Sequence, residues 1–207
     1  IRDSFIASSA GGVYAGSAHP PFSDASLPKP VGAYGQLKLA QEQVAQQELD
    51  GVAPLVIARI ANLYGPAQNP NKPQGLVNAL CRAAATRRAL SIYVPMETLR
   101  DYVYVDDAAH VAREFVQEAA EVGQGRIAVI ASGQAVSIAT LVGTVIRVTH
   151  RKIPIALGVH ASAAQQALDL RLWPTECPTA HPMVATDLAV GVRKTFDAIV
   201  GSPVGVR

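Results

Sequence analysis

The stretch Leu55-Val56-Ile57-Ala58 is an uninterrupted apolar run, and no other feature limits the possible folds of the chain as strongly. A strand of this composition has no polar face to turn to water, so it suits a parallel sheet that is covered on both sides. Two further apolar runs lie at 4–8 and 126–131. Because segments of helical length separate these runs, an α/β fold is predicted.

Further helices and strands are predicted from the same patterns. In the first helix, Leu37, Ala40 and Val44 recur at helical spacing and form an apolar stripe. Asp106-Asp107 stands before the third helix, where paired carboxylates suit a helix cap and the helix dipole. The helices are expected at 31–49, 76–88, 108–120, 137–149 and 187–199, and the further strands at 91–94, 102–105 and 153–157.

Size and charge limit what the chain can do. Its 207 residues suffice for one good core or for one and a half domains. Charged residues make up 16% of the chain, against about 25% in typical globular domains, which predicts a face covered by a partner or by further chain. The net charge of +2 and the absence of a Lys/Arg block longer than Arg87-Arg88 argue against nucleic acid as a partner.

Cysteine, histidine and apolar residues narrow the classes further. Cys81 and Cys177 stand far apart, so no disulfide framework is indicated, and a reducing cytoplasm is the expected location. The five histidines form no cluster at metal-ligand spacing, and no metal is expected. No apolar run reaches the ~18 residues of a membrane span, so no membrane is expected as a partner. The chain starts at Ile1 and runs at once into a strand, which predicts that it begins inside a longer fold.

Tyr34 and Lys38 are four residues apart on the first expected helix, so they lie one above the other. A tyrosine phenol has a pKa near ~10, and a nearby ammonium favours the phenolate. Such a pair is able to exchange protons at neutral pH, which few tyrosines do. The alternative is a surface helix on which this spacing occurs by chance, because perturbed sites are a minority of such pairs.

Polar residues follow or begin several expected strands, and open α/β sheets bind ligands at the carboxyl ends of strands. Ser8 and Ser9 end the first strand before a glycine-rich stretch that lets a ligand approach the backbone, although a plain Gly/Ser turn explains them as well. Asn62 follows the second strand, where an amide reads a ligand or forms an Asx turn. Arg100 begins a later strand, and its planar fork suits a phosphate or a surface ion pair.

Four stretches, in their order and at their separations, resemble the NAD-dependent epimerase/dehydratase family of extended short-chain dehydrogenases. The resemblance runs from Phe5 to about Thr149, and within the family it points to the nucleotide-sugar 4-epimerases of the UDP-glucose 4-epimerase kind. The four stretches are Ser8-Ser9 before Val13-Tyr14, Tyr34-x-x-x-Lys38, Arg59-x-x-Asn62-x-Tyr64-Gly65-Pro66, and Arg100-Asp101-Tyr102 before Val105-Asp106-Asp107.

The resemblance implies a role for each candidate residue. It makes Tyr34 the base that takes a proton from a sugar hydroxyl while hydride passes to NAD, and Lys38 the residue that bonds the nicotinamide ribose. It makes Ser9 the catalytic hydroxyl that helps to bind the sugar oxygen. It assigns Asn62 and Arg100 to the diphosphate side of a nucleotide-sugar substrate. The residues that it assigns to NAD are Ser8, Tyr34, Lys38 and Ile60.

The sequence departs from the family pattern in three places. The family's glycine-rich loop, which seats the dinucleotide pyrophosphate on a helix N-terminus, has no counterpart here, so the early strands of the nucleotide-binding sheet are expected to be missing. Ala10 stands where many members have the catalytic Ser or Thr, and Ser9, one residue earlier, is chosen instead. Residues 165–180 do not match the stretch that precedes the family's last helix.

The implied fold is the carboxyl-terminal portion of a Rossmann-like NAD(P)-binding fold with a small α/β substrate lobe. Residues 1–150 are expected to form a partial epimerase/dehydratase domain, and residues 151–207 the rest of the substrate lobe with the final helix. The substrate lobe itself is expected to use about 62–99 and the region after Ala131.

The implied protein is a cytoplasmic NAD-dependent nucleotide-sugar epimerase, homodimeric when intact, and this chain alone is expected to be weakly active or inactive. One alternative is a dehydratase or reductase of the same family. Family dehydratases carry acidic residues where Gly11 and Gly12 stand here, which disfavours dehydration. The other alternative is an inactive fragment that serves as a fold or interaction module.

Overall fold

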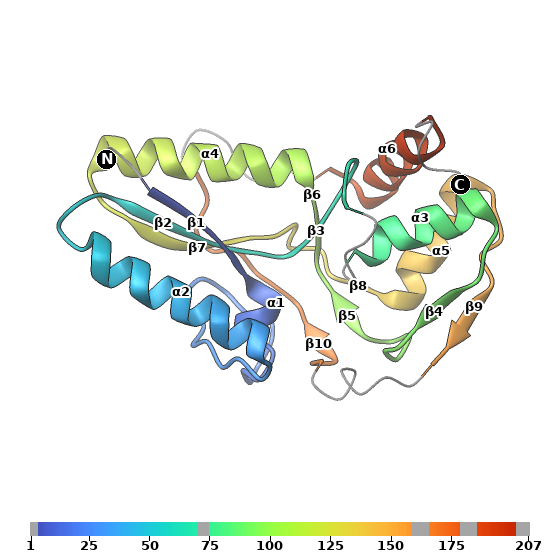
Figure 1. Cartoon of the computed structure of the whole chain (residues 1–207), viewed down its shortest axis with the longest axis horizontal. Coiled ribbons are helices and arrows are strands. Elements are labelled where there is room, and N and C mark those ends of the chain that lie inside the picture. The colour runs from blue at the N-terminus through green and yellow to red at the C-terminus, as the bar shows by residue number, and fades with distance from the viewer. Residues whose placement is uncertain (1–3, 70–74, 159–165, 179–185, 202–207) are drawn as a thin grey trace.

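The computed structural model describes residues 4–69, 75–158, 166–178 and 186–201. These residues form two lobes, each with helices packed on strands (Figure 1). The first lobe has three layers, because helix α2 covers one face of a parallel sheet and helix α4 covers the other (Figure 1). The strand order in this sheet is β1-β2-β7. Its elements are β1 (Ser4–Ser9), β2 (Leu55–Ile60), β7 (Arg126–Ile130), α2 (Ala33–Leu49) and α4 (Val105–Val122).

Strand β2 occupies the centre of this sheet, with its first five residues buried. Val56 and Ala58 pack into the apolar cluster under α4, together with Phe115 of that helix. Arg59, which follows Ala58, points to the α2 side and lies opposite Ser8 in the β1–β2 register. The prediction of a central parallel strand that is covered on both faces is therefore confirmed.

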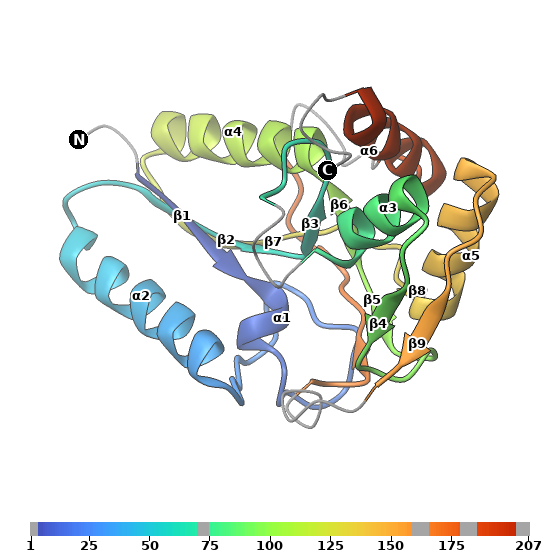
Figure 2. The ribbon, with the colours of Figure 1, turned by 45° about the vertical axis from the view of Figure 1, so that its right-hand side comes forward.

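The second lobe packs three helices around the largest apolar cluster of the described residues. Figure 2 shows these helices beside the parallel pair β4–β9. A three-stranded group, in which β5 lies between β10 and β8, completes the lobe (Figure 1). Its helices are α3 (Leu76–Thr86), α5 (Ile138–Thr149) and α6 (Leu188–Gly201). Its strands are β4 (Leu90–Ile92), β5 (Leu99–Arg100), β8 (Val136–Ser137), β9 (Ile155–Leu157) and β10 (Asp169–Leu170).

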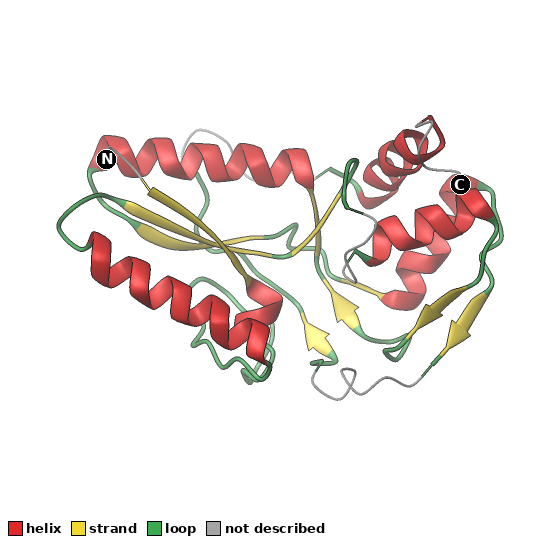
Figure 3. Cartoon of the chain, in the orientation of Figure 1, coloured by secondary structure: helices red, strands yellow, loops and turns green. Residues whose placement is uncertain are grey.

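The chain crosses between the lobes more than once. It leaves the first lobe through β3 (Asn62–Tyr64), builds α3, β4 and β5, and returns through β6 (Tyr102–Tyr104), which pairs in parallel with β3. Figure 3 shows β3 and β6 as the strands that run between the two helical groups. After β7 the chain enters the second lobe again, so the two lobes alternate along the sequence.

The predicted helices and longer strands are present, with their ends shifted by a few residues. The predicted cap of α4 is wrong in detail, because the cap residue is Tyr104 and it makes no side-chain bond. Asp106 and Asp107 lie inside the first turn instead, where their charges still complement the helix dipole. Strands β3, β5, β8 and β10 were not predicted separately, since two or three residues are too few to display a strand pattern.

The apolar stripe of α2 faces outward rather than toward the sheet. Leu37 and Val44 are each 57% exposed, and Ala40 between them is exposed as well. The buried residues of this helix are Gly35 and Glu42. Helix α2 is therefore seated on the sheet by a small residue and a charged one, together with the half-buried Leu39, which packs against the apolar cluster that contains Val13 and Val129.

Gly35 is the point at which α2 touches the short helix α1 (Ala10–Val13). A Cβ atom at residue 35 would lie 2.2 Å from the carbonyl oxygen of Gly12 and 3.0 Å from Cβ of Pro30. The two helices approach this closely because residue 35 has no side chain.

Replacing Gly35 by alanine is expected to destabilise the fold by about 1–3 kcal/mol, because α1 and α2 must separate to admit the methyl group. Urea-induced unfolding measures the change. Gly143→Ala in α5 is the matched control, since a Cβ there meets no atom within 4 Å. The control is expected to be neutral or stabilising by up to about 1 kcal/mol. Equal stability of the Gly35 variant and the wild type would contradict the close approach.

Candidate active site at the strand ends

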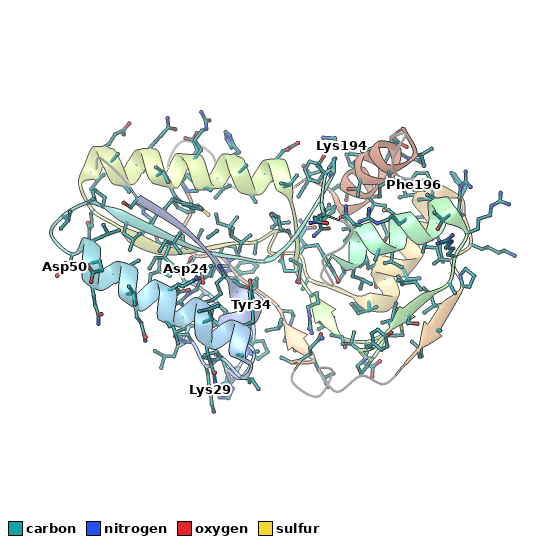
Figure 4. All side chains as sticks on the ribbon, in the orientation of Figure 1. Asp24, Lys29, Tyr34, Asp50, Lys194 and Phe196 are labelled. Atoms are coloured by element: carbon teal, nitrogen blue, oxygen red, sulfur yellow. The ribbon has the colours of Figure 1, made fainter. Side chains whose placement is uncertain are left out.

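Tyr34 and Ser9 meet at Gly12, just beyond the carboxyl end of β1. The hydroxyl of Ser9 caps α1 by accepting a hydrogen bond from the Gly12 amide at 3.2 Å. The Tyr34 ring lies over the same glycine, because a Cβ at residue 12 would be 3.2 Å from its Cε1. Tyr34 is 49% exposed, so its ring is only partly covered. Figure 4 shows it beside α1, at the end of α2 nearest the second lobe.

Lys38 stands one turn after Tyr34 on α2 and reaches the same strand. Its Nζ donates a hydrogen bond to the carbonyl oxygen of Ala7 in β1 at 2.9 Å. Ile60 ends β2 and lies opposite Ser9 in the β1–β2 register. The structure thus brings Ser9, Tyr34, Lys38 and Ile60 together around the carboxyl ends of two neighbouring parallel strands.

Ser8 differs from Ser9 in its surroundings. Ser8 is buried, and its hydroxyl donates to Oε1 of Glu42. Glu42 in turn binds the Arg59 guanidinium, with Nη2 to Oε2 at 2.7 Å, and both residues are buried. Sequence reasoning missed Glu42 and gave Arg59 no role. The available signals were that Glu42 follows Lys38 by one helical turn and that Arg59 opens the Arg-x-x-Asn motif.

Tyr14 extends this buried group to α1. Arg59 donates through Nη1 to the Tyr14 hydroxyl at 2.9 Å, and that hydroxyl donates to the carbonyl of Ser23 at 2.9 Å. Burial raises the pKa of Tyr14, although the bond from Arg59 acts in the opposite direction. Burial works against the charge of Arg59, but its hydrogen bonds to Glu42 and Tyr14 outweigh that effect and raise its pKa. The group therefore holds a charged arginine and a neutral tyrosine.

Asn62 and Arg100 form a second set at the junction of the lobes. The Asn62 side-chain amide donates through Nδ2 to the backbone carbonyl of Asp101 at 2.8 Å, and the Asn62 main-chain amide donates to the same oxygen at 3.1 Å. The amide oxygen of Asn62, an exposed residue, is what it can present to a ligand. Because Asp101 follows Arg100 directly, the structure links Asn62 to the residue next to Arg100.

Arg100 is buried where β5 meets β10. Its Nη1 donates to the carbonyl of Leu99 at 2.8 Å. Burial lowers the pKa of Arg100, while the nearby Tyr102 and Asp169 act in the opposite direction. Burial also raises the pKa of Tyr102 to about 12. The charge of Asp169 offsets only part of the cost of burying the Arg100 guanidinium. A buried guanidinium in this state suits an anionic ligand.

Two hollows in the described part of the chain lie away from the predicted residues. One of about 260 Å³ is bordered by Tyr102, Ser132 and Arg147, and another of about 650 Å³ lies where α2 and α4 end, near Gly51 and Gly123. None of the predicted site residues lines either hollow. The predicted residues lie instead at the strand ends, with Tyr34 half-exposed and Arg100 buried. Among the described residues, no three His, Cys, Asp or Glu side chains gather as metal ligands would, and no helix is long and apolar enough to cross a membrane.

Comparison with known proteins places the chain in a family. Residues 2–131 match the NAD-dependent epimerase/dehydratase family. The chain belongs to that family, which confirms the family predicted from the four motifs, and NAD is the family's cofactor, as predicted.

Three curated relatives are two nucleotide-sugar epimerases and a reductase. A dTDP-L-rhamnose 4-epimerase of Burkholderia thailandensis is 37% identical over 92 residues, which are 44% of this chain and 25% of that protein. A dTDP-4-dehydro-6-deoxyglucose reductase of Escherichia coli is 26% identical over 82% of this chain and 54% of its own length. A UDP-glucose 4-epimerase of Mycolicibacterium smegmatis is 29% identical over 76% of this chain and 47% of its own length. The chain thus spans between a quarter and about half of the length of these relatives.

A solved structure extends the likeness to three dimensions. The protein MoeE5, in complex with UDP-glucuronic acid and NAD, superposes with a TM-score of 0.77 at 24% identity, over 95% of this chain and 64% of that one. At this identity the likeness concerns the fold. The predicted Rossmann-like α/β class with parallel strands is confirmed.

The buried carboxyl of Asp101 leads to a pH prediction. Burial raises the pKa of Asp101, although hydrogen bonds from Ser132 and the following backbone amides lower it in part. A carboxyl whose pKa is raised on folding contributes stability below its unfolded value, and that contribution is lost as the pH rises through the folded value. The free energy of unfolding of the wild type, minus that of Asp101→Asn, is therefore expected to fall as the pH rises from about 4, the ordinary Asp value. Urea unfolding at a series of pH values measures it, and a constant or rising difference would contradict the raised pKa.

Proposed function

We propose that this chain carries the acid/base residues and the substrate-binding arginine of an NAD-dependent nucleotide-sugar epimerase. The observation that supports the proposal most strongly is the placing of a half-exposed Tyr34 over the Ser9-capped turn, with Lys38 bound to the same strand end. An acid/base pair at the carboxyl ends of parallel strands stands where α/β sheets bind nucleotides. The epimerase relatives add to this support.

In this proposal Tyr34 removes the proton from a sugar hydroxyl and later returns it. Lys38 holds the ribose side of the cofactor and the charge of the phenolate, and Ser9 binds the sugar oxygen. The strand ends at Ser8 and Ile60 border the nicotinamide. When bound, NAD supplies the acceptor and then the donor of the hydride. The half-exposed Tyr34 ring, beside backbone that carries no side chain at Gly12, fits such a group.

Asn62 and Arg100 bind the nucleotide diphosphate in the same proposal. The guanidinium of Arg100 supplies the positive charge, and the amide oxygen of Asn62 accepts from the substrate. We also propose that residues 1–150 are the epimerase/dehydratase part and residues 151–207 the rest of the substrate lobe with the final helix. The two free cysteines, Cys81 and Cys177, support a reducing cytoplasm as the location of the protein.

Tyr34→Phe and Lys38→Met are expected to lower kcat/KM of the intact protein by about 10²–10⁴-fold, because each removes part of the proton transfer. The measurement is conversion of UDP-, dTDP- and GDP-sugars in the presence of NAD. Lys152→Met, which removes an exposed lysine of the second lobe, is the control and is expected to leave the rate unchanged. Full activity of Tyr34→Phe would rule out the proposed base.

Analysis of the products distinguishes the alternatives. An epimerase interconverts two sugars of equal mass with no net change in NAD, a dehydratase releases water, and a reductase consumes one reduced cofactor for each product. The E. coli relative, a reductase, makes the last outcome worth measuring. Turnover of no sugar by the intact protein would favour the inactive fold or interaction module.

We further propose that the intact protein is a homodimer through the outer face of α2. Leu37, Ala40 and Val44 form an outward apolar stripe with no covering residues in the described chain. A twofold axis would place the stripe against its own copy and bury it on both sides.

Leu37→Glu combined with Val44→Glu is expected to convert the dimer to a monomer, because four carboxylates would then face one another in the interface. Sedimentation velocity measures the mass, and circular dichroism verifies the fold. Val122→Glu at the end of α4, also an exposed apolar residue, is the control and is expected to leave the dimer intact. A monomeric wild type at all concentrations would exclude this assembly.

A further inference from the structure

Glu42 is a buried carboxylate on the helix that carries Tyr34 and Lys38. It follows Lys38 by one helical turn and Tyr34 by two, so the three residues lie along one stripe of α2. The stripe runs from the strand ends toward the middle of the sheet, and its exposure falls along the way, from 49% at Tyr34 to 1% at Glu42. The deepest residue of the stripe is thus a charge.

The partners of Glu42 come from both strands beneath α2. Arg59 of β2 donates through Nε to both carboxylate oxygens at 3.2 Å and through Nη2 to Oε2 at 2.7 Å. Ser8 of β1 donates its hydroxyl to Oε1. Because Ser8 and Arg59 stand opposite each other in the strand register, one carboxylate ties α2 to two strands at the same level.

Arg59 carries the connection on to α1. Its remaining Nη1 donates to the Tyr14 hydroxyl, and its Cζ lies 5.3 Å from the centre of that ring. Tyr14 caps the C-terminal end of α1, the helix whose Gly12 contacts the Tyr34 ring. The same guanidinium therefore fixes both helices that hold Tyr34 in place.

The half-buried Leu39 gives α2 an inward apolar contact, and the helix relies on directional bonds beside it. Its apolar stripe points outward, so sliding or turning the helix would change little in the burial of those residues. The same movement would break several hydrogen bonds of the Glu42–Arg59 pair at once and leave two buried charges without partners.

We propose that Glu42 and Arg59 are positioning residues, which set the rotation and height of α2 on the sheet and thereby the places of Tyr34 and Lys38 at the strand ends. This inference rests on the proposed function, which gives Tyr34 and Lys38 their reaction. Glu42 and Arg59 act through the helix and touch neither substrate nor cofactor. They therefore govern the rate of proton transfer more than the binding of the nucleotide, which Asn62 and Arg100 carry out.

The kinetic test uses Glu42→Gln in the intact protein. This variant keeps the shape of the side chain but removes its charge, and it is expected to lower kcat by about 10–100-fold, the cost of a misplacement of about 1 Å. KM for the nucleotide sugar is expected to stay unchanged, since Asn62 and Arg100 are untouched. Glu48→Gln, which removes an exposed carboxylate from the same helix, is the control with wild-type kcat. Arg59→Lys is expected to recover part of the kcat lost in Arg59→Met.

Amide hydrogen exchange tests the positioning without any substrate. In Glu42→Gln, exchange is expected to quicken in α2 while α4 keeps its wild-type protection. Faster exchange in both helices by the same factor would mean a general loss of stability and would overturn the proposal. The double variant Glu42→Leu/Arg59→Met replaces the pair by apolar side chains that fold without unpaired charges. It is expected to melt near the wild-type Tm and yet keep the low kcat.

The outcomes separate this inference from the function on which it rests. If the wild type turns over no nucleotide sugar, the proposed function fails, and the exchange data alone decide whether the pair positions α2. If the wild type is active and the double variant matches its kcat and its exchange, apolar packing serves at this place as well as the ion pair does. The positioning role is then wrong while the proposed function stands.

Discussion

One buried ion pair, between Glu42 of α2 and Arg59 of β2, joins the helix that carries the candidate acid/base residues to the central strand of the sheet. Moving two charges out of water costs several kcal/mol for each ion, so such a pair persists only with good geometry and further hydrogen bonds. Both conditions are met, because the guanidinium faces the carboxylate with two of its nitrogens and gives a third to Tyr14. The raised pKa of Arg59 expresses the same balance, since the bonds outweigh the burial that opposes them.

Helix α2 inverts the usual distribution of residues on a surface helix. Its inner side carries Gly35, Lys38 and Glu42, which contact the sheet or α1, beside the half-buried Leu39. Its outer side carries the apolar Leu37 and Val44. A surface helix ordinarily turns its apolar stripe to the core. This arrangement gives each side of α2 its own task in the proposed dimer. Polar bonds fix the inner side on the sheet, and the apolar outer side is left for association. Position and assembly would then be controlled by opposite faces of one helix.

The elements that could be predicted are those whose cause lies in neighbouring residues. β2 was predictable because a strand covered on both faces must be apolar throughout, and the helices because their patterns extend over several turns. The inward face of α2 was not predictable in this way. The partners of Glu42 lie 17 and 34 residues away in the sequence, and the residues near Glu42 do not indicate them. The strands β5 and β8 have two residues each and are defined by pairing with distant parts of the chain, β5 with both β8 and β10.

The candidate site shows the same division. Its residue types follow from motifs, but their meeting does not, because Ser9 and Tyr34 come together through a glycine contact between two helices. Asp101 is a sharper case. A carboxyl beside an arginine suggests an exposed pair, yet Asp101 is fully buried and its carboxylate binds the amide and hydroxyl of Ser132.

Ile60 of the first set of candidate residues and Asn62 of the second are separated in the sequence by Ala61 alone. The hydrogen bonds of the backbone explain why the two sets lie on different sides of this residue. The amide of Ala61 donates to Ile130 of β7, so this residue still belongs to the sheet. The next amide, that of Asn62, donates to Asp101, which belongs to the passage into the second lobe. The chain thus exchanges one set of partners for another between two consecutive residues. Parallel strands open a crevice where neighbouring chains diverge in this way. The candidate acid/base residues lie on the sheet side of that point and Arg100 on the other. The place of the proposed site thus follows from the topology of the chain, and the local sequence supplies its residue types.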